Sequence, residues 1–587
     1  MADSLDSRAR EVIRIGNSLF DRKKAVDSLW QEIALNFFPK RATFTTKRDD
    51  GEEYADHLFS SYPSMARREL GNMLAEFLRP DRFFSIHVDD EELDEADEER
   101  AFLERLSDIQ WRAMSDPIAN LVTAAGMADH DYVTFGNAVE WFGLNVARDA
   151  LLFKNYHLRD NTWSENAEGK IDCNHRNWEP TARQLFHHFP KTISKDVKRA
   201  LGLDGNSGPG KDPDKTFACR HVVLPTRLYQ YEGKGGKKFP FVSLYVEIES
   251  ETVLEEVGLS YFCYVISRWQ QVSNSVFGTS MATDVLLPDG RTLQVVMRTL
   301  REAAEMHVNP PMVGVTEFIR SDIGLYPGGI TTADAEYDSK IGDVLRPILR
   351  DKSGFPIGQD IATALKEDIR SGFLLDKIQL PETNAKMTAT EVRRRIQEWI
   401  RASAPISKPI QRERNTPLCD GVFHILRENG VFPVQEMPDS LAGRDVKFKF
   451  RSPLDDLAEQ NEAEVYLDVR DRILMPAAQA DPAIMKTANF RKATRDAMRA
   501  AGWKAKWFNP EEAVDEESQR IEQEQEAAGM AQELATAGQV AEQGGRGLDA
   551  LLSAGSKAQP NGQGSGQGNG QGNGQGNGAV PAPGPVR

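Results

Sequence analysis

The chain has 587 residues, and its 72 Lys and Arg residues against 89 Asp and Glu residues give a formal net charge of −17. This length indicates about three or four domain-sized units, and the acidic balance argues against a protein that grips nucleic-acid phosphates tightly. The four cysteines are sparse and irregularly spaced, which excludes a disulfide framework and is typical of a reducing compartment. The N-terminal segment lacks the apolar core of a signal peptide, and no run of about 18 apolar residues predicts a membrane span.

The N-terminal part of the sequence is predicted to be helical. Apolar residues recur at spacings of three, four and seven over residues 5–38, which predicts one long amphipathic helix ended by Pro39. The acidic run 89–99 is expected to be a solvated helix start. The other predicted elements of this part are a loop at 41–53, helices at 63–78, 101–114 and 118–134, and a strand at 83–88.

Residues 139–275 are predicted to be mainly β, because runs at 221–231 and 239–248 are rich in Val, Tyr and Phe and are bounded by Gly and Pro. Within this region, 194–203 is predicted to be helical and 202–214 to be a flexible loop. A helix is then expected at 289–307, ended by Pro310-Pro311.

Residues 355–400 predict a helix, a loop and a second helix. Ile361, Leu365 and Ile369 recur at i, i+4 spacing and make the first helix amphipathic. The second helix has a capping box, in which Thr388 is the N-cap and Glu391 follows three residues later.

The C-terminal part is predicted to contain several helices interrupted by prolines. Pro405 and Pro409 are expected to kink or break the chain. Helices are predicted at 416–428, at 461–499 with breaks near Pro476 and Pro482, and at 511–533, and the Gly, Gln and Asn repeats from 544 onward predict a disordered tail.

The segment 205–211 matches part of a phosphate-binding loop, but the match is incomplete. Asp212 follows Lys211, where such a loop has a Ser or Thr for magnesium. The preceding residues also predict a helix and not the buried strand that this loop requires. The segment therefore gives little support to nucleotide binding.

Two Cys-x-His pairs are candidate zinc ligands. Cys173 with His175, and Cys219 with His221, each place two ligands on one face of a strand, and four such ligands make a closed tetrahedral site. The spacing is not that of a common zinc module, so ordinary packing of these side chains is the leading alternative.

Other candidate sites are weaker. His187-His188 has no carboxylate nearby in sequence, and the sequence contains neither a Gly-x-Ser-x-Gly elbow nor a paired metal motif. The run Arg393-Arg394-Arg395 spreads around a helix, so salt bridges with Glu391 or Glu398 are at least as well supported as contact with DNA.

A set of motifs resembles one protein family. Met387-Thr388-Ala389-Thr390-Glu391-Val392-Arg393 resembles the start of the long helix that follows the tunnel loop in bacteriophage portal proteins, the head-to-tail connectors of short-tailed phages. The insertion at 202–214 and the Gly/Gln tail depart from this pattern. Further landmarks occur in the same order as in that family: Phe37-Phe38-Pro39, Ala66-Arg67-Arg68-Glu69-Leu70, Leu78-Arg79-Pro80, Phe135-Gly136-Asn137-Ala138 and Phe277-Gly278.

The resemblance implies a mainly helical α+β portal fold that assembles as a dodecameric ring at one capsid vertex. A terminase would pump double-stranded DNA through this ring, and the genome would later leave through it. The implied regions are a wing (1–288), two stem helices (289–307 and 356–373), a clip (308–355), a tunnel loop (374–387), a long wing helix (388–433), a crown region (434–543) and the tail (544–587).

The resemblance also implies sites on these regions. The cap formed by Thr388 and Glu391 marks the end of the tunnel loop. The DNA-facing tunnel loop would carry Leu374, Leu375, Lys377, Gln379, Asn384 and Lys386, the stem channel Arg291, Arg298, Arg301, Lys366 and Arg370, and the clip surface for terminase and adaptor Arg320, Arg346, Arg350 and Lys352.

The expected partners are further copies of the chain, non-specific double-stranded DNA, the terminase large subunit, capsid and scaffold proteins, and tail adaptor or nozzle proteins. The expected locations are the virion portal vertex and, during assembly, the host cytoplasm. No cofactor, metal or catalysis is expected. Net acidity suits a conduit, because each phosphate contact adds affinity and hence friction. Two alternatives are a nucleotide-dependent DNA-processing enzyme that uses 205–211 and another virion tail protein.

Overall fold

The computed structural model divides the chain into two units, residues 1–508 and 509–587. The residues that the structure describes are 2–49, 51–78, 82–90, 97–203, 212–229, 239–308, 310, 312–314, 345–347, 354–378, 391, 408–450, 463–480, 489–503, 507–509, 513–521 and 523–530. Mixed helices and strands confirm the mainly helical α+β class. None of the helices described is both long enough and apolar enough to cross a bilayer.

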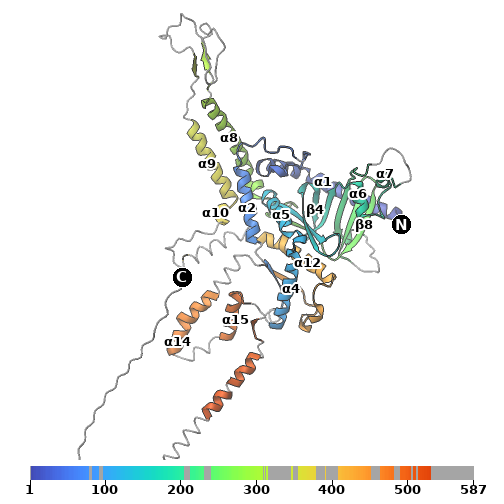
Figure 1. Cartoon of the computed structure of the whole chain (residues 1–587). Coiled ribbons are helices and arrows are strands. Elements are labelled where there is room, and N and C mark those ends of the chain that lie inside the picture. Colours follow the sequence, from blue (N-terminus) through green and yellow to red (C-terminus); the bar gives the residue numbers. More distant parts are fainter. Residues whose placement is uncertain are drawn as a thin grey trace, which may run out of the picture. The chain divides into compact units, whose positions relative to one another are not determined.

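Helix α1 (Ala2–Phe37) is the long N-terminal helix that the apolar spacing predicts (Figure 1). It buries Trp30, Ile33 and Phe37 completely or nearly so. The helix ends before Pro39, because proline has no N–H to continue the hydrogen-bond ladder. A short 3-10 turn, η1 (Pro39–Arg41), follows.

Helices α2 (Tyr62–Leu78), α4 (Asp97–Ser115) and α5 (Leu121–Phe135) confirm the next three predicted helices. The third begins later than position 118. Residues Pro117–Ala119 instead form the 3-10 helix η2, and Asn120 adopts a left-handed conformation with φ of 60° before α5 starts. The start of the acidic run, at 91–96, lies outside the described residues.

Two antiparallel sheets confirm the β prediction for residues 139–275. The first has the strand order β3-β2-β9 and the second the order β4-β5-β6-β7-β8. The strands are β2 (Asn137–Leu144), β3 (Leu151–Tyr156), β4 (Asn161–Glu165), β5 (Ile171–Trp178), β6 (Cys219–Pro225), β7 (Phe241–Glu247), β8 (Thr252–Leu259) and β9 (Tyr264–Arg268).

Helices cover both faces of the five-stranded sheet. On one face, Val12 of α1 packs against Val222 and Leu244. On the other face, α6 (Ala182–His188) and α7 (Lys195–Leu201) form a buried cluster with Cys219 and Leu254. Helix α7 is predicted from the sequence, whereas α6 is not, although Thr181 and Gln184 form a capping box that marks its start.

A third pairing joins distant parts of the chain. Strand β1 (Phe84–Val88) pairs antiparallel with β12 (Val446–Phe450), and Phe84 lies opposite Phe450. Both strands pack on the cluster that contains buried residues of α4 and α12 (Thr416–Glu428). Part of the sequence assigned to the crown is thus paired with a strand assigned to the wing.

In the part of the chain that the structure describes, three π-helical segments each end two residues before a proline. They are η6 (Ala282–Leu286), η9 (Gln411–Asn415) and η12 (Arg470–Leu474), which precede Pro288, Pro417 and Pro476. The wider π turn accommodates the missing N–H and the clash of the ring with the preceding turn. The predicted start at 289 and the predicted break near 476 are therefore wrong, because helix runs through both prolines into α8 (Leu287–Val308) and α14 (Met475–Ala480).

Other C-terminal predictions are confirmed in part. Residues 408–410 are helical, so Pro409 lies inside a helical turn. Two predicted helical stretches are confirmed, by helix α15 (Phe490–Ala500) and by the helical residues 513–521 and 523–530. Three other parts of the prediction lie outside the described residues: Pro482, the sequence 401–407 with Arg401 and Pro405, and the tail from 544. The remaining elements are η3 (Leu158–Asp160), η4 (Thr226–Leu228), η10 (Val434–Glu436), η11 (Asp439–Leu441), β10, β11, α9 and α10.

Candidate functional site

Two helices form a hairpin that carries most of the predicted site residues. Helix α8 packs beside α9 (Gly354–Gly372), as Figure 1 shows. Close contact depends on glycines in α9: a Cβ on Gly358 would lie 2.7 Å from Leu300 Cδ2, and a Cβ on Gly372 would lie 2.4 Å from Leu286 Cδ2. The contact is tightest at Gly372, because the Leu286 side chain that it meets, at the end of η6, is buried.

The base of this hairpin is built into the main hydrophobic cluster. Phe373 is fully buried, and its ring lies 5.7 Å from that of Phe37 in α1. Leu286 and Ile369 belong to the same cluster, which Trp30 and Phe135 also join. The predicted apolar face of α9 is thus confirmed at its C-terminal end.

The far half of the hairpin has no such cover. Ile361 and Ile357, towards the N-terminus of α9, are exposed by 46% and 61%. On α8, Val308 is also exposed. The amphipathic face predicted from Ile361, Leu365 and Ile369 is therefore buried only towards the base of the hairpin.

A buried glutamine fastens α8 to the segment before α2. The side-chain oxygen of Gln294 accepts hydrogen bonds from the backbone N–H groups of Phe59 and Ser60, both at 2.8 Å. Its amide nitrogen donates to the Ser60 carbonyl at 2.9 Å. Sequence reasoning missed this residue, since nothing in the helical pattern distinguishes it from a surface glutamine.

Most of the predicted stem cations bind nearby carboxylates. Arg291 forms an ion pair with Glu32, and Arg298 Nε lies 2.8 Å from Glu302 while its guanidinium lies over the Phe59 ring. Arg301 is exposed and Lys366 is half-buried. Arg370 Nε lies 2.5 Å from Asp376, and hydrogen bonding to that carboxylate raises the pKa of the guanidinium.

The first residues assigned to the tunnel loop are folded. Residues Leu375–Ile378 form the short helix α10, Leu375 is buried in the main cluster, and Leu374 packs against that cluster with φ of 58°. The assignment of Leu375 to a DNA-facing surface is therefore wrong, because its side chain completes the hairpin base. Lys377 lies in α10. Gln379, Asn384, Lys386, Thr388 and the arginines at 393–395 lie outside the described residues, and Glu391 is in a helical conformation.

The clip is described only at its two ends. Strand β10 (Met312–Gly314), which follows α8, pairs antiparallel with β11 (Leu345–Pro347), which precedes α9. Arg346 is on β11, opposite Val313. Arg320, Arg350 and Lys352 lie outside the described residues.

Two motifs from the family resemblance meet in the core. Gly136 has φ of 70°, which ends α5 and turns the chain into β2, as expected for a glycine at this position. Asn137 Nδ2 donates to the Gly278 carbonyl at 2.7 Å, and its Oδ1 accepts from the Gly278 N–H at 2.8 Å. This reciprocal pair of hydrogen bonds joins the two short motifs, which are 141 positions apart.

A buried arginine joins η9, β2 and α5. Arg414 of η9 binds Glu140 of β2 through its Nε at 2.6 Å and also pairs with Asp129 of α5. Burial disfavours its charged form, but the two carboxylates outweigh that effect and raise the pKa of the guanidinium. Sequence reasoning missed this network, because its members are almost 300 positions apart.

The proposed zinc ligands do not come together. In the β5–β6 register His175 lies opposite Val222 and Arg176 lies opposite His221, so His175 and His221 project from opposite faces of the sheet. The same alternation separates Cys173 from Cys219. His221 instead binds the Tyr264 hydroxyl and the Ser243 hydroxyl. Among the described residues, no cluster of three or more metal-ligand side chains is present.

The sites weighed for catalysis gain no support. Residues 205–211 lie outside the described part, but the element before them is the helix α7 and not a strand, as predicted. His187 and His188 lie at the exposed end of α6. Burial, followed by the neighbouring His187 and Lys154, lowers the pKa of His188.

Comparisons with known proteins agree with the motif resemblance. A probable portal protein of Bordetella phage BPP-1 is 23% identical over 444 residues, which cover 73% of this chain and 76% of the relative. The portal protein of Salmonella phage epsilon15 is 22% identical over 543 residues, which cover 90% of this chain and 93% of the relative. The family model described as bacteriophage head to tail connecting protein matches residues 9–508. The chain therefore belongs to the bacteriophage head to tail connecting protein family.

Proposed function

We propose that this chain is the subunit of a portal ring that serves as the channel for double-stranded DNA at one capsid vertex. The observation that carries the proposal is the α8–α9 hairpin, which is anchored at its base and leaves apolar residues of its far half exposed. Exposed apolar surface of this kind marks a protein contact. In a closed ring each copy would cover its neighbour's hairpin, and a dodecamer is the expected size.

The channel would be lined by the stem and by the segment after α10. Three stem cations, Arg291, Arg298 and Arg370, bind carboxylates. Arg301 and Lys366 form no ion pair with any residue that the structure describes. Neutralised arginines attract phosphates weakly, and the net charge of −17 adds repulsion. Such a surface would let DNA pass in either direction.

Two further regions are expected to bind other proteins. The clip, which includes Arg346 on β11, would bind the terminase large subunit during packaging and tail adaptor proteins afterwards. The wing would meet capsid and scaffold proteins during assembly in the host cytoplasm. The chain would need no cofactor and would perform no catalysis of its own.

Electron microscopy of the purified chain tests the ring. Closed rings with a central opening wide enough for duplex DNA are expected. Open filaments or monomers at all concentrations would contradict the proposal. ATP hydrolysis that is lost in Lys211→Ala would instead favour the DNA-processing enzyme.

Shortening residues 379–386 tests the tunnel loop. Because α10 and the Arg370–Asp376 ion pair remain intact, ring assembly should be unchanged. Packaging or retention of DNA should be impaired, measured as the length of packaged genome protected from nuclease. Full-length genomes in the variant would contradict the assignment of this segment to the channel.

A further inference from the structure

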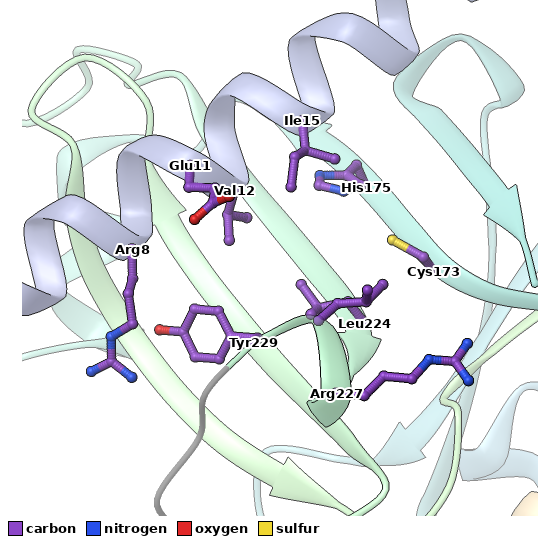
Figure 2. Close-up of a pocket in the computed structure, with 10 residues that line it drawn as sticks. Arg8, Glu11, Val12, Ile15, Cys173, His175, Leu224, Arg227 and Tyr229 are labelled. Carbon is purple, nitrogen blue, oxygen red and sulfur yellow. The ribbon is translucent and has the colours of Figure 1, made fainter.

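The pocket between α1 and the five-stranded sheet has charged groups that already pair within the subunit (Figure 2). At its rim Arg227 binds Asp172 at 2.6 Å, and Arg8 lies 3.8 Å from Glu256. Paired groups of this kind do not indicate a partner outside the subunit. A segment near the C-terminal end of the described chain has the opposite character.

The distal segment (residues 463–480, 489–503 and 507–508) has two helical parts but no core of its own. Residues 463–480 are helical throughout and include η12 and α14, and α15 is the second part. Among the described residues of the segment only Ala463 is buried, and none belongs to a hydrophobic cluster of the subunit. Short helices without apolar packing are marginal in water, so this segment needs a contact from outside the subunit.

An apolar stripe lies along the first helical part. Val465, Val469 and Ile473 follow each other at four-residue spacing, which places them on one side of the helix, and they are exposed by 47%, 37% and 60%. Leu467 and Met475 of the same helix are also exposed. Contiguous exposed apolar surface of this kind marks an interaction site.

Acidic residues on the same helix favour protein as the partner of this stripe. Glu464, Asp468 and Asp471 alternate with the exposed apolar residues along the sequence. Carboxylates repel DNA phosphates, and they are costly to place in the apolar part of a bilayer. The stripe therefore fits a protein surface that combines apolar and basic side chains.

A tryptophan pair on the same segment has this composition. Trp503 and Trp507 are exposed by 44% and 52%, and their rings meet edge to face with centres 5.2 Å apart. Beside them, Arg495 and Arg499 of α15 each lie 5.5 Å from the centre of the Phe508 ring. The segment thus carries two complementary patches on different elements.

We propose that the apolar stripe of one copy packs against the tryptophan pair of the neighbouring copy, so that the core of the distal segment forms between copies. A closed head-to-tail ring needs two different, complementary patches on every subunit, and this segment supplies both. Tryptophans are typical anchors of protein interfaces. The inference rests on the ring proposed above, and it adds a contact that is separate from the α8–α9 hairpin.

Cysteine crosslinking in purified rings tests this inference. The four native cysteines are buried thiols, so introduced cysteines at exposed positions are the reactive ones. Two double variants, Ile473→Cys with Trp507→Cys and Val469→Cys with Trp503→Cys, place one thiol on each patch and keep one tryptophan. With a short bismaleimide, both should give a ladder of covalent dimers, trimers and larger species on denaturing gels.

Matched variants should lack this ladder. Ile473→Cys combined with Val146→Cys, on the exposed turn between β2 and β3, should stay at the mass of one chain. Val465→Asp added to either double variant should abolish the ladder and leave the rings intact, because a carboxylate would be buried at this contact while the hairpin contact remains.

Two results would overturn the proposal. One is intact rings in which both double variants stay at the mass of one chain with reactive thiols. The other is loss of both thiols without a ladder, which would place the two patches in contact within one chain. Absence of rings in the electron microscope would instead contradict the ring itself, and this inference with it.

Discussion

The two ends of the α8–α9 hairpin contain similar residues in different surroundings. At the base, Leu286, Ile369 and Phe373 are buried among residues of α1, α2 and α5. In the far half, Ile357 and Ile361 of the same helix α9 are exposed. Apolar side chains at helical spacing therefore have two different surroundings in one helix, because other elements of the subunit pack only against its base. The base stabilises the subunit, and the far half is available for assembly.

Placing charged residues in the far half of the hairpin tests this difference most directly. The double variant Ile357→Asp, Ile361→Asp should abolish rings, because carboxylates would be buried without partners at the contact between copies. The unfolding free energy of the subunit should change by no more than about 0.5 kcal/mol, as for other exposed positions. Native mass spectrometry measures assembly, and urea unfolding measures stability. Phe186→Asp on α6 is the exposed control, and intact rings in the double variant would refute the assembly role.

Truncation at the base should have the opposite outcome. Phe373→Ala removes a fully buried ring that packs on Phe37, so the subunit should lose about 3–5 kcal/mol of unfolding free energy. Ile361→Ala should cost less than about 1 kcal/mol in the same urea titration. Equal losses at the two positions would show that the two ends do not differ in the subunit.

Lowering the pH should destabilise the packing of the hydrophobic cluster at the base of the hairpin before it changes the far half. His157 packs on Phe44 at 4.9 Å, and burial, followed by Arg41, lowers its pKa to about 4. The pKa of this imidazole is about 6.5 in the unfolded chain, so the unfolded chain binds the proton more readily than the folded protein. The unfolding free energy that the neutral imidazole contributes above about pH 6.5 is therefore lost as the pH falls to about 4. This single group should account for about 2 kcal/mol at pH 5.

Urea unfolding at pH 7 and pH 5 checks this prediction. The wild type should lose about 2 kcal/mol more than His157→Gln between the two values. The exposed variant His187→Gln should follow the wild type. A His157→Gln variant with the full acid dependence of the wild type would contradict it.

Gly358 and Gly372 of α9 give the test with the smallest expected effect. A methyl group at Gly372 meets Leu286, which is buried and cannot move aside, so Gly372→Ala should cost about 1–2 kcal/mol. At Gly358 the methyl group meets the end of the half-buried Leu300, which can rotate. The higher helix propensity of alanine, about 1 kcal/mol, then offsets the contact. In thermal unfolding, Gly372→Ala should therefore have a clearly lower melting temperature than Gly358→Ala. The reverse order would contradict the proposed difference between the base and the far half.

Sequence reasoning placed the helices that carry the candidate site but not all of their side chains. The cations Arg298 and Arg370 lie on α8 and α9 as predicted, because apolar spacing defines these helices locally. Leu375 was assigned to a loop because Pro381 and polar residues follow it. Its burial depends on the cluster around Phe37, which no local window contains.

The proline-based prediction of a helix break near Pro476 is wrong. The structure inserts a π turn there and continues the helix, and it does the same before Pro288. The energetic reason for a break is real, but packing of the flanking helix can favour a local change of turn over termination. The proline alone does not decide between these outcomes.

By itself the sequence determined the long helix α1, the amphipathic helices of the hairpin, the β-rich region and the family, since periodicity, caps and short motifs are local properties. Only the tertiary structure decided the pairing of β1 with β12, the hydrogen bonds between Asn137 and Gly278, and the burial of Arg414 between Asp129 and Glu140. These contacts join positions more than 140 residues apart, and their partners are selected by the completed core.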